Sequence, residues 1–209
     1  MKPIGPDLIA ETLRLAAYAQ AYDRLVAGLA ALGAGRQAPR VGQIFPGFAL
    51  PDASGRFHTL SDLLAGGRPV VISVHRGNWC PWCRVETAGW GDAAAALAAA
   101  GARLVTISAE VGGGAAALAN RAGSLGLVDV DLGLCLALGL VISIAPDLAQ
   151  AYLAGGDDLA ALLGGSGRLL PIPATYLLDG AGIVRFAFVD PDFRSRAEPA
   201  AVLAVLTSG

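Results

Sequence analysis

The segment that decides the fold is VVISVHRGNWCPWC, residues 70–83. Val70–Val74 is an apolar run of strand length, and a Cys80-x-x-Cys83 pair follows it after a short polar loop. Pro81 suits the first position of a helix, because its missing N–H would have no partner there in any case. The segment therefore predicts a strand that leads into a helix, with Cys80 at or beside the N-cap and Cys83 within the first turn.

This position favours an ionised cysteine. The free N–H groups and the dipole at the start of a helix stabilise negative charge. A cysteine there can have a pKa of about 3.5–7.5 instead of about 8.5, and the thiolate is the attacking form. A redox role further requires that the two sulfur atoms lie within bonding reach of each other and open to solvent.

The alternative for a close cysteine pair is a structural zinc site. Zinc takes four ligands, usually from two such pairs, and the further candidates in this chain are Cys135, His58 and His75. We therefore favour a redox role for Cys80 and Cys83 and expect neither a metal nor a cofactor. Cys135 lies within an apolar stretch, which indicates a small core residue more than a second resolving thiol.

Composition argues against several classes of function. The chain of 209 residues has 15 basic and 17 acidic side chains, a net charge of −2, so we expect no binding to nucleic acid or to an anionic membrane. The longest apolar stretch, Leu132–Ala145, is too short to span a bilayer and is interpreted as buried core. Residues 1–7 lack the layout of a secretion signal, so we expect a cytoplasmic protein. In that reducing compartment a close cysteine pair is more often catalytic or metal-binding than structural.

The order of the predicted elements indicates an α/β fold with an N-terminal helical extension. Helical periodicity over residues 6–33 and the linker Gly33–Pro39 predict a helical arm over residues 1–40, which could serve packing or dimerisation. In the main domain, residues 41–209, strands alternate with helices, as in a parallel sheet covered on both faces. We expect strands at 48–50 and 56–58, which form a small hairpin, at 70–74, 103–108 and 127–130, and at 174–178 and 183–188, which form a hairpin with a turn at Asp179–Gly182. Helices are expected at 61–64, 81–100, 115–122, 147–163 with a break at Gly155-Gly156, and 198–206.

From about residue 41 to its end, the chain resembles the thioredoxin superfamily. The resemblance rests on the strand, the Trp-Cys-x-x-Cys helix start, and Ile172-Pro173 leading into a hairpin. The segment from Gly42 to Ser108 is similar to the peroxiredoxin-like branch of the alkyl hydroperoxide reductase and thiol-specific antioxidant family. The stretches WCPWCRVE and IPATYLLD are also similar to bacterial thiol:disulfide oxidoreductases. The resemblance implies a thioredoxin-like three-layer α/β/α fold.

The resemblance also implies roles for residues around the dithiol. Cys80 matches the exposed attacking thiol of the family, and Cys83 matches its buried resolving thiol. Glu86, one helical turn beyond Cys83, resembles an acid that exchanges protons with such a dithiol. Arg76 matches an arginine just ahead of the site and could hold a thiolate or a peroxide oxygen.

Substrate binding is expected at two neighbouring places. Pro173, preceded by Ile172, matches the proline that these folds hold in the cis form opposite the dithiol, where backbone carbonyls can face a bound thiol substrate. Trp79, next to the attacking thiol, is expected to line a docking groove. Trp82 could share that groove or cap the core, and Trp90 is expected in the core.

The chain departs from two patterns of the family. Typical peroxiredoxins carry Pro-x-x-x-Thr-x-x-Cys, and an overlay on Cys83 puts Arg76 at the proline position and Cys80 at the threonine position. The peroxide-binding loop is therefore altered. Thioredoxins have a buried aspartate in the strand before the dithiol, whereas the strand here has none, so His75 or Glu86 would have to move protons.

Three functions are consistent with these residues. The first is a thiol-disulfide oxidoreductase with antioxidant duty, in which Cys80 attacks a substrate disulfide or oxidised sulfur and Cys83 then attacks Cys80 to release the product. The second is a thiol-dependent hydroperoxide peroxidase, in which one thiolate becomes a sulfenic acid and the other condenses with it. The third is a non-catalytic binding module. Both enzymes would need a reducing partner such as a thioredoxin or glutathione, and the sequence allows a homodimer.

Overall fold

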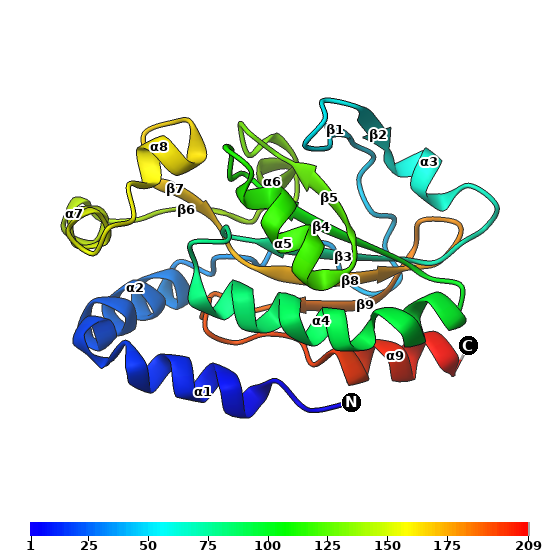
Figure 1. The fold of residues 1–209 in the computed structure, drawn as a ribbon, viewed down its shortest axis with the longest axis horizontal. Helices are drawn as coiled ribbons and strands as arrows, with labels where there is room; N and C mark the ends of the chain where they lie inside the picture. Colours follow the sequence, from blue (N-terminus) through cyan, green and yellow to red (C-terminus); the bar gives the residue numbers. More distant parts are fainter. Residues whose placement is uncertain (209) are drawn as a thin grey trace.

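A central five-stranded sheet organises the computed structural model, which describes residues 1–208 (Figure 1). The strand order is β5-β4-β3-β8-β9. The strands are β3 (Val70–His75), β4 (Arg103–Ser108), β5 (Leu125–Val128), β8 (Ala174–Leu178) and β9 (Val184–Val189). β3, β4 and β5 run parallel, whereas β8 is antiparallel to β3 and to β9. The prediction of a parallel sheet is therefore wrong for β8. β8 and β9 form a tight hairpin, so one of these two strands must run antiparallel to β3.

Helices cover both faces of this sheet. On one face lie α4 (Pro81–Ala99), α5 (Gly114–Ala122) and α9 (Pro199–Thr207), with α4 in the middle (Figure 1). They pack over Val71, Leu104 and Leu177 of the strands. The other face belongs to the larger core, in which Ile72 and Tyr176 pack with residues from α3 (Leu60–Leu64) and α6 (Gly133–Ala137). The result is the three-layer α/β/α order of the thioredoxin-like fold.

Two short hairpins flank the sheet. β1 (Ala49–Pro51) and β2 (Phe57–Thr59) pair as expected. The second hairpin, β6 (Val141–Ser143) with β7 (Leu169–Pro171), is absent from the sequence prediction. It encloses α7 (Pro146–Ala154) and α8 (Leu159–Leu163), which form separately because the chain turns at Gly155-Gly156, as predicted. The stretch interpreted as continuous core is divided between α6 and β6 by a turn at Gly139, whose φ is +67°.

The N-terminal arm, residues 1–40, consists of α1 (Gly5–Arg14), a 3₁₀ turn η1 (Ala16–Tyr18), α2 (Ala19–Ala31) and the linker that follows. α1 lies beside α4, and α2 continues toward the end of the sheet where α7 lies (Figure 1). The arm therefore covers part of the helical layer and one end of the sheet.

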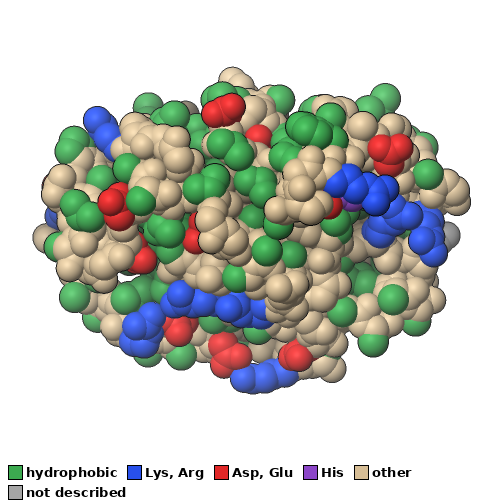
Figure 2. Space-filling model, turned by 45° about the horizontal axis from the view of Figure 1, so that its top comes forward, with side chains coloured by type: hydrophobic (Ala, Val, Ile, Leu, Met, Phe, Trp, Pro, Cys, Tyr) green, Lys and Arg blue, Asp and Glu red, His purple; other side chains and the backbone are tan. Residues whose placement is uncertain are grey.

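Charges of both signs are mixed on the surface. Figure 2 shows basic and acidic side chains interspersed with apolar ones over one face of the molecule. No helix in residues 1–208 is long and apolar enough to cross a bilayer.

Candidate active site

The cysteine pair lies where β3 hands over to α4. Cys80 is the N-cap of α4, with extended backbone angles, and Pro81 takes the first helical position. Cys83 follows within the first turn, and both residues are free thiols. This local structure agrees with the sequence prediction, because a capping residue followed by proline is a strong start signal for a helix.

Both thiols are closed off from solvent. Cys80 and Cys83 each have 0% of their surface exposed. The expected exposure of Cys80 is therefore wrong. The aromatic residues around the pair are buried as well: Trp79 and Trp82 belong to the same core cluster, and Tyr22 from the arm packs edge-on against Trp82 with ring centroids 5.6 Å apart. Trp79 is thus part of a packed aromatic layer in this conformation and does not line an open groove.

The two thiols differ in acidity, in the opposite order to that expected. Burial, together with a hydrogen bond to Cys83 and the charge on it, raises the pKa of Cys80 well above its usual value. Burial also acts to raise the pKa of Cys83, but the hydrogen bond from Cys80, the Arg196 charge and His75 outweigh it, so that pKa lies well below the usual value. Cys83, in the first turn of α4, is therefore the more acidic of the two thiols.

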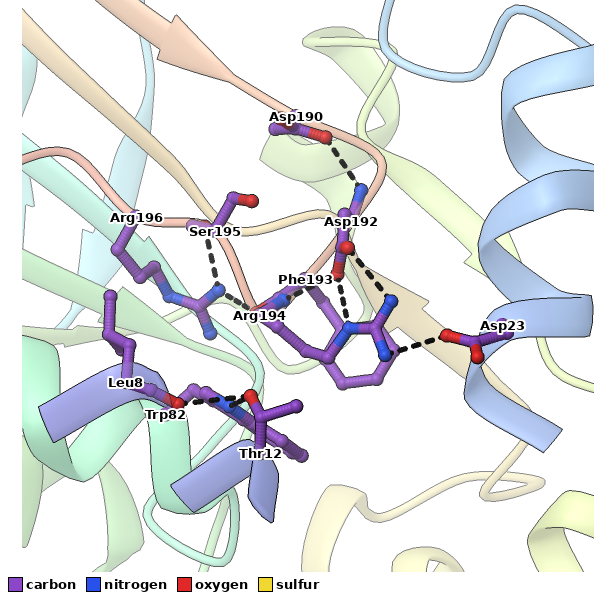
Figure 3. A network of polar contacts seen from close by, with 10 residues as sticks. All are labelled: Leu8, Thr12, Asp23, Trp82, Asp190, Asp192, Phe193, Arg194, Ser195 and Arg196. Carbon is purple, nitrogen blue, oxygen red and sulfur yellow. Dashed lines mark hydrogen bonds and ion pairs between the residues drawn. The ribbon is translucent and has the colours of Figure 1, made fainter. Parts of the chain in front are cut away.

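Arg196, from the segment between β9 and α9, supplies the positive charge next to this thiolate. Its Nη2 lies 3.4 Å from Cys83 Sγ, and its Nε lies 2.7 Å from Glu86 Oε2. Its Nη1 donates to the backbone carbonyls of Phe193 and Ser195, which fix the guanidinium in place (Figure 3). Sequence analysis missed Arg196, since it lies 113 residues from Cys83 in the chain and no motif marks it.

Alternation along the strands gathers a polar group around Glu86. Ser73 and Thr175 are paired across β3 and β8 and point to the same face, and each donates to Glu86 Oε1 at 3.2 Å. His75, two residues after Ser73, lies 3.6 Å from Glu86 Oε2 through its Nδ1. Glu86 and His75 are therefore both at the dithiol, where the sequence predicts a proton-transferring group. Trp90 is fully buried, as predicted, and its indole donates to Ser73 Oγ at 3.2 Å.

Arg76 occupies a second basic position, on the Cys80 side. Only 1% of its surface is exposed. Its guanidinium carbon lies 4.2 Å and 4.8 Å from the ring centroids of Phe193 and Trp79, and its Nη2 donates to Tyr152 Oη at 3.1 Å. Nε and Nη1 have no hydrogen-bond partner within residues 1–208.

Glu110, at the end of β4, holds the loop before the dithiol. Its buried carboxylate accepts the backbone N–H of Asn78. Gly77 in the same loop has a φ of +146°, and a Cβ there would lie 2.5 Å from the Trp79 ring. Glycine is therefore required where the loop closes against Trp79. Sequence analysis missed Glu110, because a single acid after a strand has no distinctive spacing.

Ile172 and Pro173 lie between β7 and β8. The register pairs Ala174 with Val74, so Pro173 stands level with His75 at the dithiol end of the sheet. No peptide bond in residues 1–208 is cis, and the expected cis form of Pro173 is therefore wrong. Ile172 N donates to Leu140 O at 2.7 Å, which continues the β6–β7 pairing up to Pro173, and the bond before Pro173 keeps the trans form that is ordinarily preferred.

The remaining cysteine and histidine lie elsewhere. Cys135 is buried in α6, and burial raises the pKa of its thiol. His58 is partly buried, and its Nε2 lies 2.8 Å from Asp52 Oδ2. In the part of the chain that the structure describes, no three His, Cys, Asp or Glu side chains gather as metal ligands would.

The fold and the dithiol define a thioredoxin-fold protein, and comparison with known proteins narrows the class. The sequence profile of the AhpC/TSA family matches residues 41–187. The chain therefore belongs to the AhpC/TSA family, a family of thiol-dependent oxidoreductases of the peroxiredoxin type. No curated protein sequence matches the chain.

Solved structures of peroxiredoxins share the fold. Peroxidoxin BcpB of Mycobacterium tuberculosis is 23% identical, with a TM-score of 0.61, over 81% of this chain and 97% of that one. Reduced Prx3 of Vibrio vulnificus in complex with H2O2 is 23% identical, with a TM-score of 0.61, over 80% and 98%. Peroxiredoxin Q of Xanthomonas campestris is 20% identical, with a TM-score of 0.56, over 77% and 90%.

Proposed function

We propose that the protein reduces hydroperoxides at the Cys80–Cys83 pair, with Cys83 as the attacking thiolate and Cys80 as the resolving thiol. The observation that carries this proposal is the position of Arg196, whose Nη2 lies 3.4 Å from Cys83 Sγ. A guanidinium at that distance stabilises the thiolate and can also donate to an oxygen that approaches it. The assignment reverses the two roles that the resemblance implies.

The proposed reaction begins on Cys83. The thiolate attacks the outer oxygen of the hydroperoxide, so that an S–O bond forms and the O–O bond breaks. The leaving alkoxide takes up the proton that Cys83 gave up on ionisation and departs as the alcohol, while Cys83 becomes a sulfenic acid. The sulfur is oxidised by two electrons and the peroxide is reduced by the same two.

Resolution needs no large movement in this chain. Cys80 and Cys83 lie three residues apart at the start of the same helix, and each thiol shifts the pKa of the other, so Cys80 is placed to attack the sulfenic sulfur. An S–S bond then forms and water leaves. A dithiol reductant of the thioredoxin type, or two molecules of glutathione, would exchange with the Cys80–Cys83 disulfide and restore both thiols.

Glu86 and His75 have a positioning role in this proposal. Glu86 Oε2 pairs with Arg196 Nε at 2.7 Å, which fixes the guanidinium relative to Cys83. His75 faces both Glu86 and the Cys83 thiol, so it can accept the proton that Cys83 releases. These are the proton-handling groups that replace the strand aspartate of thioredoxins.

A second candidate function is reduction of disulfides by the same pair. The two-residue spacing of Cys80 and Cys83 favours it, since a mixed disulfide on one sulfur would lie next to the other. The two functions use the same thiols but differ in the bond that is broken. A direct comparison of substrates therefore separates them.

The test mixes reduced protein with tert-butyl hydroperoxide in one arm and with a small aliphatic disulfide in the other. We expect the hydroperoxide to be consumed much faster than by free thiol, with formation of one intramolecular disulfide per chain. Cys83→Ser should abolish this consumption. Cys80→Ser should consume one equivalent and stop at a sulfenic acid, which dimedone traps on Cys83 in mass spectrometry.

Cys135→Ser is the matched control, because Cys135 is also buried but lies apart from the pair in α6. Its rate should equal that of the wild type. Consumption no faster than free thiol, together with rapid reduction of the disulfide, would replace the first function by the second. Trapping of the sulfenic acid on Cys80 would overturn the assignment of roles.

A further inference from the structure

The closure of the site is difficult to reconcile with any reaction at sulfur. Both thiols have 0% of their surface exposed, whereas a substrate must reach one of them. The elements that cover the pair are therefore as important as the residues beneath. One of these elements is the N-terminal arm, which lies outside the part of the chain matched by the AhpC/TSA profile.

The arm makes direct contact with the aromatic layer over the dithiol. Trp82 lies between the two cysteines in sequence, and its Nε1 donates to Thr12 Oγ1 of α1 at 3.1 Å (Figure 3). The ring of Tyr22 from α2 packs edge-on against Trp82 and Phe193, with centroids 5.6 Å and 5.1 Å away. Tyr22 is also close enough to Cys80 for that thiol to affect its pKa, which burial raises. The arm is thus part of the wall that closes the site.

The arm is held on the main domain by apolar packing of a few residues, with Tyr22 and Leu29 of α2 and Leu8 of α1 in the core, and by a small number of polar contacts. Glu198, the N-cap of α9, accepts the backbone N–H groups of Ile4 and Gly5 at 2.9 Å and 2.8 Å, so it caps the start of α1 from the main domain. Arg194 donates to Asp23 of α2 at 2.8 Å (Figure 3). α1 itself buries one of its ten residues, Leu8. Most positions of α1 and α2 are exposed or half-buried, whereas every position of β3 and β8 is buried. The arm is therefore expected to open at a lower free energy than the sheet beneath it.

The linker Gly33–Pro39, at the end of the arm, is suited to act as a hinge. Gly33 and Gly35 in the linker have φ values of +66° and +79°, which glycine adopts without strain. Its backbone hydrogen bonds are short-range turns, from Arg36 to Gly33 and from Ala38 to Gly35. A change of these few backbone angles would let α1 and α2 move together as one body.

A buried polar group beneath the arm indicates that something binds there when the arm is away. Arg76 is 1% exposed and leaves Nε and Nη1 without partners. A charged donor without partners at this burial is costly unless another group satisfies it in a different state. Phe193, against which Tyr22 packs, also lies 4.2 Å from the Arg76 guanidinium. Withdrawal of Tyr22 would therefore open the layer next to Arg76 and Cys80.

We propose that the N-terminal arm is a lid over the Cys80–Cys83 pair, and that it swings about the Gly33–Pro39 linker to admit substrate to the thiols and to Arg76. The proposal of a lid depends on the proposed function only for the identity of the substrate that enters. Opening of the lid makes the two thiols accessible to reagents in solution, so it can be measured without a peroxide.

The first experiment measures alkylation of the reduced full-length protein by iodoacetamide, with peptide mapping by mass spectrometry to follow Cys80 and Cys83 separately from Cys135. If the arm opens locally, the rate at the pair should be almost independent of low concentrations of urea, while the rate at Cys135 should rise steeply with urea as global unfolding begins. Equal urea dependence at all three cysteines would overturn the proposal, because the pair would then be reached only by unfolding.

The second experiment loosens the arm. Glu198→Gln weakens the cap on α1. We expect alkylation at the pair to accelerate about fivefold for each ~1 kcal/mol of stabilisation that the cap loses. Glu11→Gln is the matched control: it removes an ion pair that joins two residues of α1, Glu11 and Arg14. The control rate should equal that of the wild type, and equal rates in all three proteins would contradict the lid.

The third experiment locks the arm. A Cβ at Gly89 of α4 would lie 3.8 Å from Ile4 Cβ, the mean separation in a disulfide. In a Cys80→Ser background, Ile4→Cys with Gly89→Cys should form a bridge that ties α1 to α4 and stops alkylation of Cys83, while the same protein with this bridge reduced should react. Undiminished alkylation in the bridged protein would exclude the arm as the gate. A missing peroxidase activity with intact gating would instead refute the proposed function alone.

Discussion

At the scale of single residues, the site depends on which sulfur carries the charge. Arg196 and His75 both act on Cys83, while burial raises the pKa of Cys80. The difference in acidity between the two thiols does not come from the start of the helix, because Cys80 is the N-cap residue and yet is the weaker acid. For Cys80, desolvation and the charge on Cys83 raise the pKa by more than the charges of Arg76 and Arg196 lower it. The helix dipole, which contributes about 0.3–1 kcal/mol, does not reverse this result.

The first prediction concerns the pH dependence of this thiolate. In Cys80→Ser, the far-ultraviolet absorbance of the Cys83 thiolate should persist below the ordinary thiol pKa of about 8.5. Alkylation rates corrected for accessibility should follow the same titration. Cys83→Ser should lose the signal, and a midpoint at or above the ordinary value would contradict the arrangement around Cys83.

The second prediction concerns the pH dependence of the free energy of unfolding, whose sign is fixed by the lowered pKa of Cys83. A thiol whose pKa is lowered on folding stabilises the protein above its unfolded pKa, and this contribution is lost as the pH falls through the folded pKa. The difference in free energy of unfolding between Cys80→Ser and the Cys80→Ser, Cys83→Ser double variant should therefore be largest near pH 9 and shrink on acidification, as measured by urea unfolding. A difference that grows toward acidic pH would contradict the assignment.

The third prediction concerns Glu86. Glu86→Gln leaves the Arg196 charge buried without its 2.7 Å partner, so we expect a loss of about 3–5 kcal/mol in the free energy of unfolding. Urea unfolding at neutral pH checks it. Asp92→Asn, an exposed acid on the same helix, should change the stability by less than about 0.5 kcal/mol.

At the scale of elements, the helical layer is set by small residues of α4. Gly91 lets α5 approach closely, since a Cβ there would lie 2.5 Å from Arg121 O. Gly28 in α2, by contrast, has no atom within 4 Å of its added Cβ. Both glycines lie in helix interiors, where alanine is intrinsically preferred.

The fourth prediction uses this contrast. Gly28→Ala should raise the free energy of unfolding by about 0.5–1 kcal/mol, the intrinsic difference between the two residues in a helix. Gly91→Ala should lower it by about 1–3 kcal/mol, because a backbone carbonyl must move. Thermal or urea unfolding of the two variants beside the wild type gives both signs in one experiment. Stabilisation by Gly91→Ala would mean that α4 and α5 are less closely packed.

The sequence was sufficient for elements with a local cause. The strand before the dithiol, the helix that begins at Pro81 and the hairpin at Asp179 follow from apolar runs, a capping signal and turn residues. The β6–β7 hairpin was missed because its two strands lie on either side of α7 and α8. The same reason explains Arg196 and Glu110, which reach the site only through the tertiary fold, whereas Glu86 was found because it lies one helical turn from Cys83.

At the scale of the whole molecule, the balance of charge determines how substrates arrive. Basic and acidic side chains number 15 and 17 and are mixed on the surface (Figure 2). Such a surface produces no strong field to steer a charged ligand.

The fifth prediction follows from this balance. The rate constant for a hydroperoxide that carries a carboxylate should change by less than about twofold between low and physiological ionic strength, because a surface of balanced charge leaves little attraction or repulsion to screen. Initial rates in a salt series measure it, with the free-thiol reaction as the control. A steep salt dependence would indicate a charged surface at the entrance.

The aromatic layer over the dithiol has an optical consequence. The chain has three tryptophans: Trp79 and Trp82 adjoin Cys80, and Trp90 is hydrogen-bonded to Ser73, a donor to Glu86. Two of the three indoles thus adjoin the dithiol, and the third is linked to Glu86 through Ser73. The intrinsic tryptophan fluorescence of the protein therefore reports on the dithiol and on Tyr22 above it. Oxidation and arm movement can thus be followed in the unlabelled protein.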